Sequence, residues 1–193
     1  MWEYLLRIDR NLFLYLNGLG AENWDYFWLL LSKRGANVVL YLLILFFYGK
    51  KHGYKSALIL FFTAVLLVVL TDQGTNVFKN SFQRLRPCNN PELDGIMRHI
   101  EGYCGGGYSF FSGHSSNSFA LAVLFSTVFR FVKWVPLFLF TVASFIAYSR
   151  VYLGVHFPLD ILCGSIFGVF TGYIFSILLE RFLSEKVGNT KKI

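Results

Sequence analysis

The sequence predicts an all-α fold: a polytopic membrane helix bundle with five to six transmembrane helices and an N-terminal amphipathic interfacial helix. Composition is the first reason, because 55% of the 193 residues are hydrophobic and only 15% are charged, outside the usual range of soluble domains. Long apolar segments that alternate with basic turns are the second. No repeat or linker divides the chain, so residues 1–193 are expected to form a single domain.

The net charge of +7 has two readings. A basic excess can indicate a nucleic acid partner, but on so apolar a chain it is typical of lysines and arginines that flank membrane spans. We therefore expect a lipid bilayer and no nucleic acid as the partner. Three cysteines are too few for a disulfide framework and lack the paired spacing of a zinc site.

The N-terminal segment 1–19 mixes charged residues such as Arg7 and Asp9 with apolar ones such as Phe13. This mixture is typical of an amphipathic helix that lies in the membrane interface. The segment lacks the unbroken apolar core and small-residue cleavage site of a signal peptide.

The spans are predicted from apolar runs, since a helix needs about 20 residues to cross the hydrocarbon core. Stretch 24–31 is cut off from the next run by a Ser-Lys-Arg-Gly sequence, so it is either an interfacial helix or half of a kinked first span. The remaining candidates are 36–49, 54–70, 118–129, 134–148 and 161–179. In the last of these, glycines recur every fourth residue, a spacing that lets helix backbones approach closely; they are Gly164, Gly168 and Gly172.

Orientation follows from three basic clusters that alternate with the spans and should share the cytoplasmic side. They are Lys50, Lys51 and Lys55; Arg130 and Lys133; and Arg181, Lys186, Lys191 and Lys192. The opposite face then receives the loop 79–111 and the turn 150–156. In a bacterial inner membrane, this face is the periplasm.

Several polar residues should meet on that outer face. Lys79, Arg86 and Arg150 are three cations of the kind that bind the oxygens of a phosphate. Lys79 and Arg86 lie on one helical face if the helix continues between them. Gly113, opening the next helix, adds backbone N–H groups.

Two histidines complete this predicted pocket. His156 and Asp160 are four residues apart, so on one helical face the carboxylate can accept the Nδ1 proton and leave Nε2 as a nucleophile. His114 would then be the general acid that protonates the leaving oxygen. The carboxylates near the pocket are scattered through a loop, so we expect no bound metal and no cofactor.

Each residue also has a structural reading. A lone cation at a membrane boundary is usually a snorkelling anchor, and a His and Asp four apart often form a structural hydrogen bond. The coincidence of all these residues on one face, against the positive-inside trend, favours a functional site.

Three motifs resemble the signatures of the type 2 phosphatidic acid phosphatase (PAP2) superfamily of membrane lipid phosphatases, over residues 54–179. They are Lys79 to Pro87 (Lys, six residues, Arg-Pro), Phe111-Ser112-Gly113-His114, and Ser149-Arg150 followed by His156 and Asp160. Phe111 stands where the family usually has proline, which affects loop stiffness and not chemistry. The related soluble vanadium haloperoxidases are excluded by the spans.

The resemblance implies a metal-independent phosphatase that acts through a phosphohistidine. His156 would be the nucleophile, Asp160 its partner and His114 the acid. Lys79, Arg86, Ser112, Gly113 and Arg150 would hold the phosphate.

The substrate stays open among undecaprenyl pyrophosphate, lipid A, phosphatidylglycerol phosphate and phosphatidic acid, and so does the oligomeric state. Two alternatives use the same pocket: a lipid phosphotransferase that passes the phosphoryl group to an acceptor other than water, and a non-catalytic lipid-binding membrane protein.

In the outer loop, we expect Cys88 and Cys104 to form a disulfide, because they would lie on the oxidising side. Asp72, near the outer end of a span, is a functional candidate that could instead orient Lys79 or mark the helix exit.

Overall fold

The computed structural model describes residues 1–100, 102–130 and 132–190, and this part of the chain is helical with no strand. The α-helices are α1 (Trp2–Gly18), α2 (Asp25–Ser32), α3 (Arg34–His52), α4 (Tyr54–Phe82), α5 (Gly113–Val128), α6 (Trp134–Tyr152) and α7 (Pro158–Thr190). Short 3-10 helices are η1 (Glu22–Trp24), η2 (Pro87–Asn89) and η3 (Pro91–Leu93). The predicted all-α class is confirmed.

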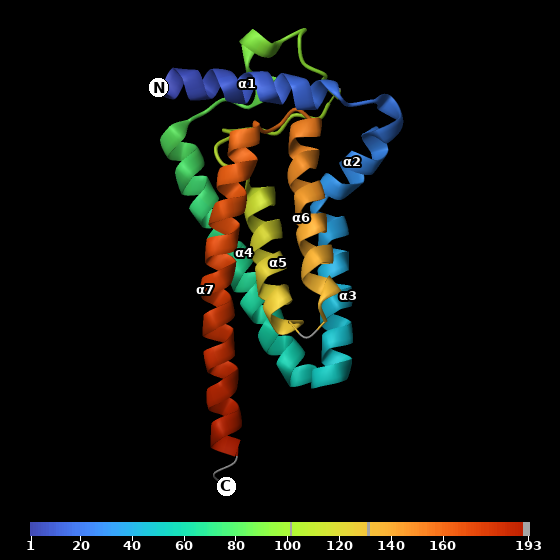
Figure 1. Cartoon of the computed structure of the whole chain (residues 1–193), viewed down its shortest axis with the longest axis vertical. Coiled ribbons are helices and arrows are strands. Elements are labelled where there is room, and N and C mark those ends of the chain that lie inside the picture. Colours follow the sequence, from blue (N-terminus) through green and yellow to red (C-terminus); the bar gives the residue numbers. More distant parts are fainter. Residues whose placement is uncertain (101, 131, 191–193) are drawn as a thin grey trace.

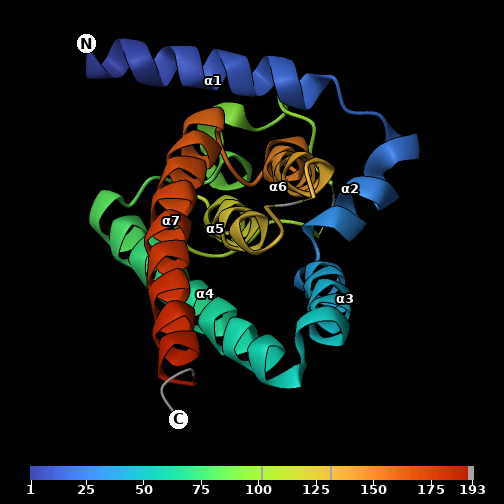
Figure 2. The same cartoon turned by 60° about the horizontal axis from the view of Figure 1, so that its bottom comes forward.

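Helix α5 is the centre of the bundle, with α4, α6 and α7 packed around it (Figures 1 and 2). None of its residues is exposed, and most are buried. Its 16 residues span about 24 Å at 1.5 Å per residue, short of the hydrocarbon core of a bilayer. Helix α5 is therefore a core helix rather than one that meets lipid.

The predicted glycine stripe of α7 lies directly against α5. A Cβ atom placed on Gly164 would come 2.6 Å from the carbonyl oxygen of Ser112, and one on Gly172 would come 2.5 Å from that of Ala120. A Cβ on Gly168 would collide with the carbonyl of Ser116. The two helices thus meet backbone to backbone, as the spacing predicted.

Three helical segments in the described part of the chain are long and apolar enough to cross a membrane: Tyr54–Leu93, Trp134–Tyr152 and Pro158–Ser184. The pair Glu22–Ser32 and Arg34–His52 passes the same test together and is bent by 57°, which makes a fourth span if the pair counts as one. The prediction of five to six spans is not confirmed, because α5 is too short and the first candidates form this single broken pair.

The bend between α2 and α3 occurs at Lys33, whose backbone is extended (φ −72°, ψ 124°). This is the Ser-Lys-Arg-Gly break that the sequence indicated. The bend brings the buried Ser32, at the end of α2, into the polar end of the bundle.

Helix α1 crosses that end of the bundle (Figure 1). Its buried side chains, Asp9, Phe13 and Asn17, are four residues apart and face inward. The Asn17 amide donates to the carbonyl oxygens of Val151 and Tyr152 at 3.2 and 3.0 Å, so α1 is tied to the end of α6. Whether this helix lies in a membrane interface stays a prediction.

The turn between α3 and α4, the turn between α5 and α6 and the end of α7 all lie at the end opposite α1 (Figure 1). These segments carry the basic clusters, so the predicted alternation of the spans agrees with the fold. Lys191 and Lys192 of the third cluster lie outside the described residues.

Candidate active site

His156 lies in the turn between α6 and α7 and is buried. Its Nδ1 is 3.5 Å from Oδ2 of Asp160, an ion-pair separation longer than a good hydrogen bond. The prediction that both residues share a helical face was wrong, because α7 begins only at Pro158. Asp160 lies in the first turn of α7, and its Oδ2 accepts the backbone N–H of Phe157 at 2.9 Å. The side-chain pairing is thus achieved across the start of the helix.

Arg86 faces the other ring nitrogen of His156, with Nη1 3.3 Å from Nε2. The helix does not continue from Lys79 to Arg86, so the condition for a shared helical face is not met: α4 ends at Phe82, and Gln83 adopts a left-handed conformation (φ 48°). Arg86 itself is extended, as a residue before proline prefers. Its guanidinium donates to the carbonyl oxygens of Val155 at 3.1 Å and Gly106 at 3.3 Å, which hold it beside the histidine.

Arg150, near the end of α6, is buried and hydrogen-bonded on one side of its guanidinium. Nη1 donates to the Ser32 hydroxyl and, at 2.9 Å, to the hydroxyl of Tyr103. The buried Nε has no hydrogen-bond partner among the described residues. An unpaired buried N–H is costly, so this one fits a site in which an anion completes the pairing.

Lys79 and Gly113 meet where α4 passes the start of α5. A Cβ on Gly113 would lie 3.8 Å from Nζ of Lys79 and 3.4 Å from Oδ1 of Asp72. These polar groups therefore lie beside the N-terminus of α5. Asp72 accepts a hydrogen bond from Nδ2 of Asn117 at 2.8 Å, so it ties α4 to α5 within reach of Lys79.

Ser112 and His114 flank Gly113 at this helix start. The Ser112 hydroxyl accepts the N–H of Ser115 at 3.4 Å as an N-cap, and its own N–H donates to the carbonyl oxygen of Asp160 at 3.0 Å. His114 places Nε2 3.2 Å from the carbonyl oxygen of Ser32. Because Ser32 also contacts Arg150, His114 belongs to the same polar cluster as the other predicted residues.

The electrostatic environment of His156 favours the neutral ring. Burial is the largest cause that lowers the pKa of His156 well below its ordinary value of 6.5, followed by Arg150, Arg86 and Lys79. A neutral ring keeps the Nε2 lone pair available at neutral pH, as a nucleophile requires.

A disulfide joins Cys88 and Cys104, so this prediction is confirmed. Cys88 comes two residues after Arg86, and Cys104 lies between Tyr103, which contacts Arg150, and Gly105, which packs on the Arg86 guanidinium. The bond therefore fixes the loop that holds two of the three cations.

Phe111, at the position where the PAP2 motif has proline, is buried between two helices. Its ring centroid lies 4.9 Å from that of Phe78 on α4 and 5.2 Å from that of Phe167 on α7. These contacts anchor the segment that leads into Ser112.

A cavity of about 190 Å³ opens beside His114, between α3, α4 and α5. Its polar lining includes Arg34, Asn37 and Asp72, and its apolar lining includes Val68 and Leu121. The mixed lining suits the junction between a polar headgroup and an acyl chain.

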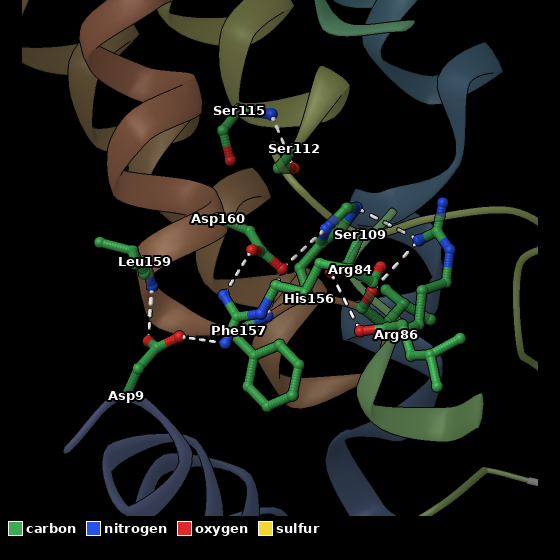
Figure 3. Close-up of polar contacts among 12 residues, drawn as sticks. Asp9, Arg84, Arg86, Ser109, Ser112, Ser115, His156, Phe157, Leu159 and Asp160 are labelled. Carbon is green, nitrogen blue, oxygen red and sulfur yellow. Dashed lines mark hydrogen bonds and ion pairs between the residues drawn. The ribbon is translucent and has the colours of Figure 1, made fainter. Parts of the chain in front are cut away.

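Sequence reasoning missed Arg84 and Asp9. Arg84 donates to Oδ1 of Asp160 at 2.8 Å and to Oδ2 of Asp9 at 2.6 Å (Figure 3). Arg84 lies inside the first motif, at a position that the motif does not specify. For Asp9, the only signal was its place on the same face as Phe13 and Asn17.

Comparison with known proteins gives consistent results. The family model of the PAP2 superfamily matches residues 56–183. The chain is 37% identical over 174 residues to a lipid A 4'-phosphatase of Porphyromonas gingivalis, covering 89% of this chain and 72% of that protein. It is 34% identical over 193 residues to a lipid A 4'-phosphatase of Bacteroides thetaiotaomicron, covering 98% and 85%.

Two crystal structures share the fold. LpxE of Aquifex aeolicus superposes with a TM-score of 0.62 at 26% identity, covering 86% of this chain and 92% of that one. A PAP2-type phosphatidylglycerolphosphate phosphatase of Bacillus subtilis gives a TM-score of 0.68 at 22% identity, covering 94% and 87%. From the motifs, the fold and these relatives, we conclude that the chain is a multi-pass membrane lipid phosphatase, a phosphoric ester hydrolase, and belongs to the PAP2 superfamily.

Proposed function

We propose that the protein removes the 4'-phosphate of lipid A at the periplasmic face of the inner membrane, through a phosphohistidine on His156. The observation that carries the chemistry is the buried His156 ring, with Nδ1 beside Asp160 and Nε2 beside Arg86. A phosphoryl group that enters between Nε2 of His156 and Nη1 of Arg86 would contact the nucleophile and the cation at the same time.

In the first step, Nε2 of His156 attacks phosphorus, and a P–N bond forms as the bond to the sugar oxygen breaks. Lys79, Arg86 and Arg150 stabilise the charge on the peripheral oxygens, which is the main source of catalysis in phosphoryl transfer. The N–H groups at the start of α5 assist them, since the first amides of a helix lack helical partners. Burial is the largest cause that lowers the pKa of His114, to about 2 in the free site, so the ring must take up its proton when the negative phosphate binds and raises that pKa. His114 then gives this proton to the leaving oxygen, and Asp160 stabilises the positive charge on the His156 ring.

In the second step, water attacks phosphorus, the P–N bond breaks, and phosphate leaves. His114, now neutral, accepts a proton from the water and returns to its starting state. The electron pair of the P–N bond returns to Nε2, so the enzyme needs no further reactant.

Lipid A is favoured among the four lipid phosphates because both 4'-phosphatase relatives align over most of their length. The cavity beside His114 supports this choice, since the leaving group lies on the side of the acid. Its lining, with Arg34 and Asp72 beside Val68 and Leu121, suits a group at the junction between a sugar and an acyl chain. The proposal of a periplasmic face is supported by the basic turns at the opposite end and by the disulfide, since disulfides form in an oxidising compartment.

The test is phosphate release by the purified protein in detergent from lipid A phosphorylated at both positions, at the 4' position alone or at the 1 position alone. Phosphatidic acid, phosphatidylglycerol phosphate and undecaprenyl pyrophosphate complete the panel. We expect release from the 4' position, unaffected by EDTA and abolished in His156→Ala. His99→Ala is the matched control, because His99 is exposed and outside the site.

Three results would contradict this function. Release only from the 1 position or from a glycerol lipid would reassign the substrate. Transfer of the phosphate to an added alcohol, with no free phosphate, would favour a phosphotransferase. Equal release by wild type and His156→Ala would remove the phosphohistidine.

A further inference from the structure

Asp9 of α1 reaches the start of α7 and is buried there. Its Oδ1 accepts the backbone N–H of Leu159 at 2.7 Å, and its Oδ2 accepts Nη2 of Arg84 at 2.6 Å. Burial is the largest influence on the pKa of Asp9 and raises it, whereas Arg84 and the Leu159 amide oppose the rise. A helix that is far from the three motifs in sequence thus contacts their centre.

Arg84 is shared between two carboxylates. Its Nη1 donates to Asp160 at 2.8 Å and its Nη2 to Asp9, while the guanidinium lies 3.9 Å from the ring centroid of Phe157. The backbone carbonyl of Arg84 accepts the N–H of Ser109 at 2.8 Å, which fixes the segment as well as the side chain. Figure 3 shows the resulting chain of contacts from Asp9 through Arg84 to Asp160 and His156.

The net charge of these connected side chains determines how strongly Asp160 can stabilise a positive charge on His156. Asp9, Arg84 and Asp160 together carry one negative charge, whereas Arg84 and Asp160 alone would carry none. Nucleophilic attack places a positive charge on the His156 ring, which already lies among cations. A carboxylate that is fully neutralised by Arg84 would stabilise that charge poorly.

We propose that Asp9 and Arg84 are positioning residues for the histidine reaction: Arg84 orients Asp160 toward His156, and Asp9 takes up part of the Arg84 charge so that Asp160 stays effectively negative. This role rests on the proposed reaction at His156. It also gives α1 a part in catalysis that its amphipathic pattern did not indicate.

Opposite charge changes should therefore move the acidic limb of the pH profile in opposite directions. In Asp9→Asn, Arg84 neutralises Asp160 more fully, so the ring of His156 loses its proton at lower pH. In Arg84→Gln, two carboxylates remain near the ring, so it keeps its proton to higher pH. The other titratable groups that face the pair are unchanged in both variants; they are Lys79, Arg86, His114, Arg150 and Cys163.

The experiment measures kcat and kcat/KM against pH for wild type, Asp9→Asn, Arg84→Gln and the double variant, on the lipid that the wild type hydrolyses. We expect the limb to move down by about half a pH unit in Asp9→Asn and up by about one in Arg84→Gln, with the double variant between them. We also expect kcat to fall about tenfold in each single variant while KM changes less. Arg10→Gln is the matched control, because it breaks the neighbouring ion pair of α1 to Glu92 without touching Asp160.

The proposal would be overturned if the acidic limb of the pH profile stayed at its wild-type position in both Asp9→Asn and Arg84→Gln. It would also be overturned if the limb moved in the same direction in both, even if kcat fell. Should Arg84→Gln fail to fold, Arg84→Lys must keep the limb of the wild type, and Asp9→Asn alone decides the direction. Titration of the His156 ring by NMR in detergent should show the same opposite shifts without turnover. Equal activity of wild type and His156→Ala would instead contradict the proposed function, and the ring titration would still test the charge effect.

Discussion

The contact between α5 and α7 and the outer layer made by α1 and the loop 83–112 hold the site in different ways. Along α5 and α7, glycines bring the backbones together, and the Ser116 hydroxyl adds a hydrogen bond to the carbonyl oxygen of Gly164 at 3.0 Å. In the outer layer, ion pairs, side-chain hydrogen bonds and a disulfide connect the elements. The helices that carry His114 and Asp160 are thus held by close packing, whereas Arg84, Arg86 and Arg150 depend on polar contacts that substitutions can remove one at a time.

The largest effect is expected for Gly168→Ala, which forces a methyl group into the carbonyl of Ser116. Neither backbone can move without displacing the whole helix, so the free energy of unfolding should fall by roughly 3 kcal/mol, the upper end for overpacking. Thermal melting in detergent measures this. Gly35→Ala is the matched control, since a Cβ there meets nothing within 4 Å; equal melting of the two variants would show that the glycine contact is not tight.

Removing the disulfide should have the next largest effect. Cys88→Ser with Cys104→Ser opens a loop with a sequence separation of 16 residues. Because the unfolded chain gains entropy when this loop is opened, the free energy of unfolding should fall by about 3 kcal/mol. Because the loop positions Arg86 and Tyr103, KM for the phosphate should rise more than kcat falls. Kinetics with and without reductant on the wild type check this, and insensitivity to reductant would contradict it. Cys163→Ser is the control for thiol loss.

Tyr103→Phe should have a smaller effect. It removes the hydroxyl that accepts from Arg150 at 2.9 Å and pairs with Ser32 at 2.9 Å. A hydrogen bond to a charged group contributes about 1.5–3 kcal/mol, so kcat/KM should fall by about ten- to a hundredfold if the loss falls on the bound phosphate. Tyr108→Phe, in the same loop, serves as the control. Unchanged kinetics would mean that Arg150 needs no support from this hydroxyl.

The smallest effect is expected for Arg10→Gln. Its ion pair with Glu92 is 2.5 Å long, but both side chains are substantially exposed, and such pairs contribute about 0–1 kcal/mol. Melting temperature and kcat should stay within error of the wild type. A large loss here would show that the α1 layer depends on exposed charges and not on Asp9 and Asn17.

The sequence predicted the family, the enzyme class, the all-α fold, the glycine contact and the disulfide, because each has a local signature. It also predicted residues that the fold brings into one cluster, although their roles stay proposals. The span count was not predictable in the same way, since apolar composition does not distinguish a lipid-facing helix from the buried α5.

Local details of the site were harder to predict. The break after Phe82 depends on the left-handed Gln83, a residue type with no strong preference for that conformation. The contacts of Ser32 and Asp9 depend on how distant helices pack, and neither residue belongs to a motif. Contacts of this kind can be identified only from the three-dimensional structure.

The glycine stripe has a further consequence for how a bulky amphiphile enters and leaves. Helices α5 and α7 touch through their main chains, so a change of side-chain rotamer cannot let them slide past each other. They therefore form a rigid surface toward an incoming molecule. The cavity beside His114 is lined by α3, α4 and α5, so we expect the amphiphile to enter there. Discrimination among amphiphiles should accordingly be altered by exchanging the α3 residues that line this cavity, while the contact between α5 and α7 is left intact.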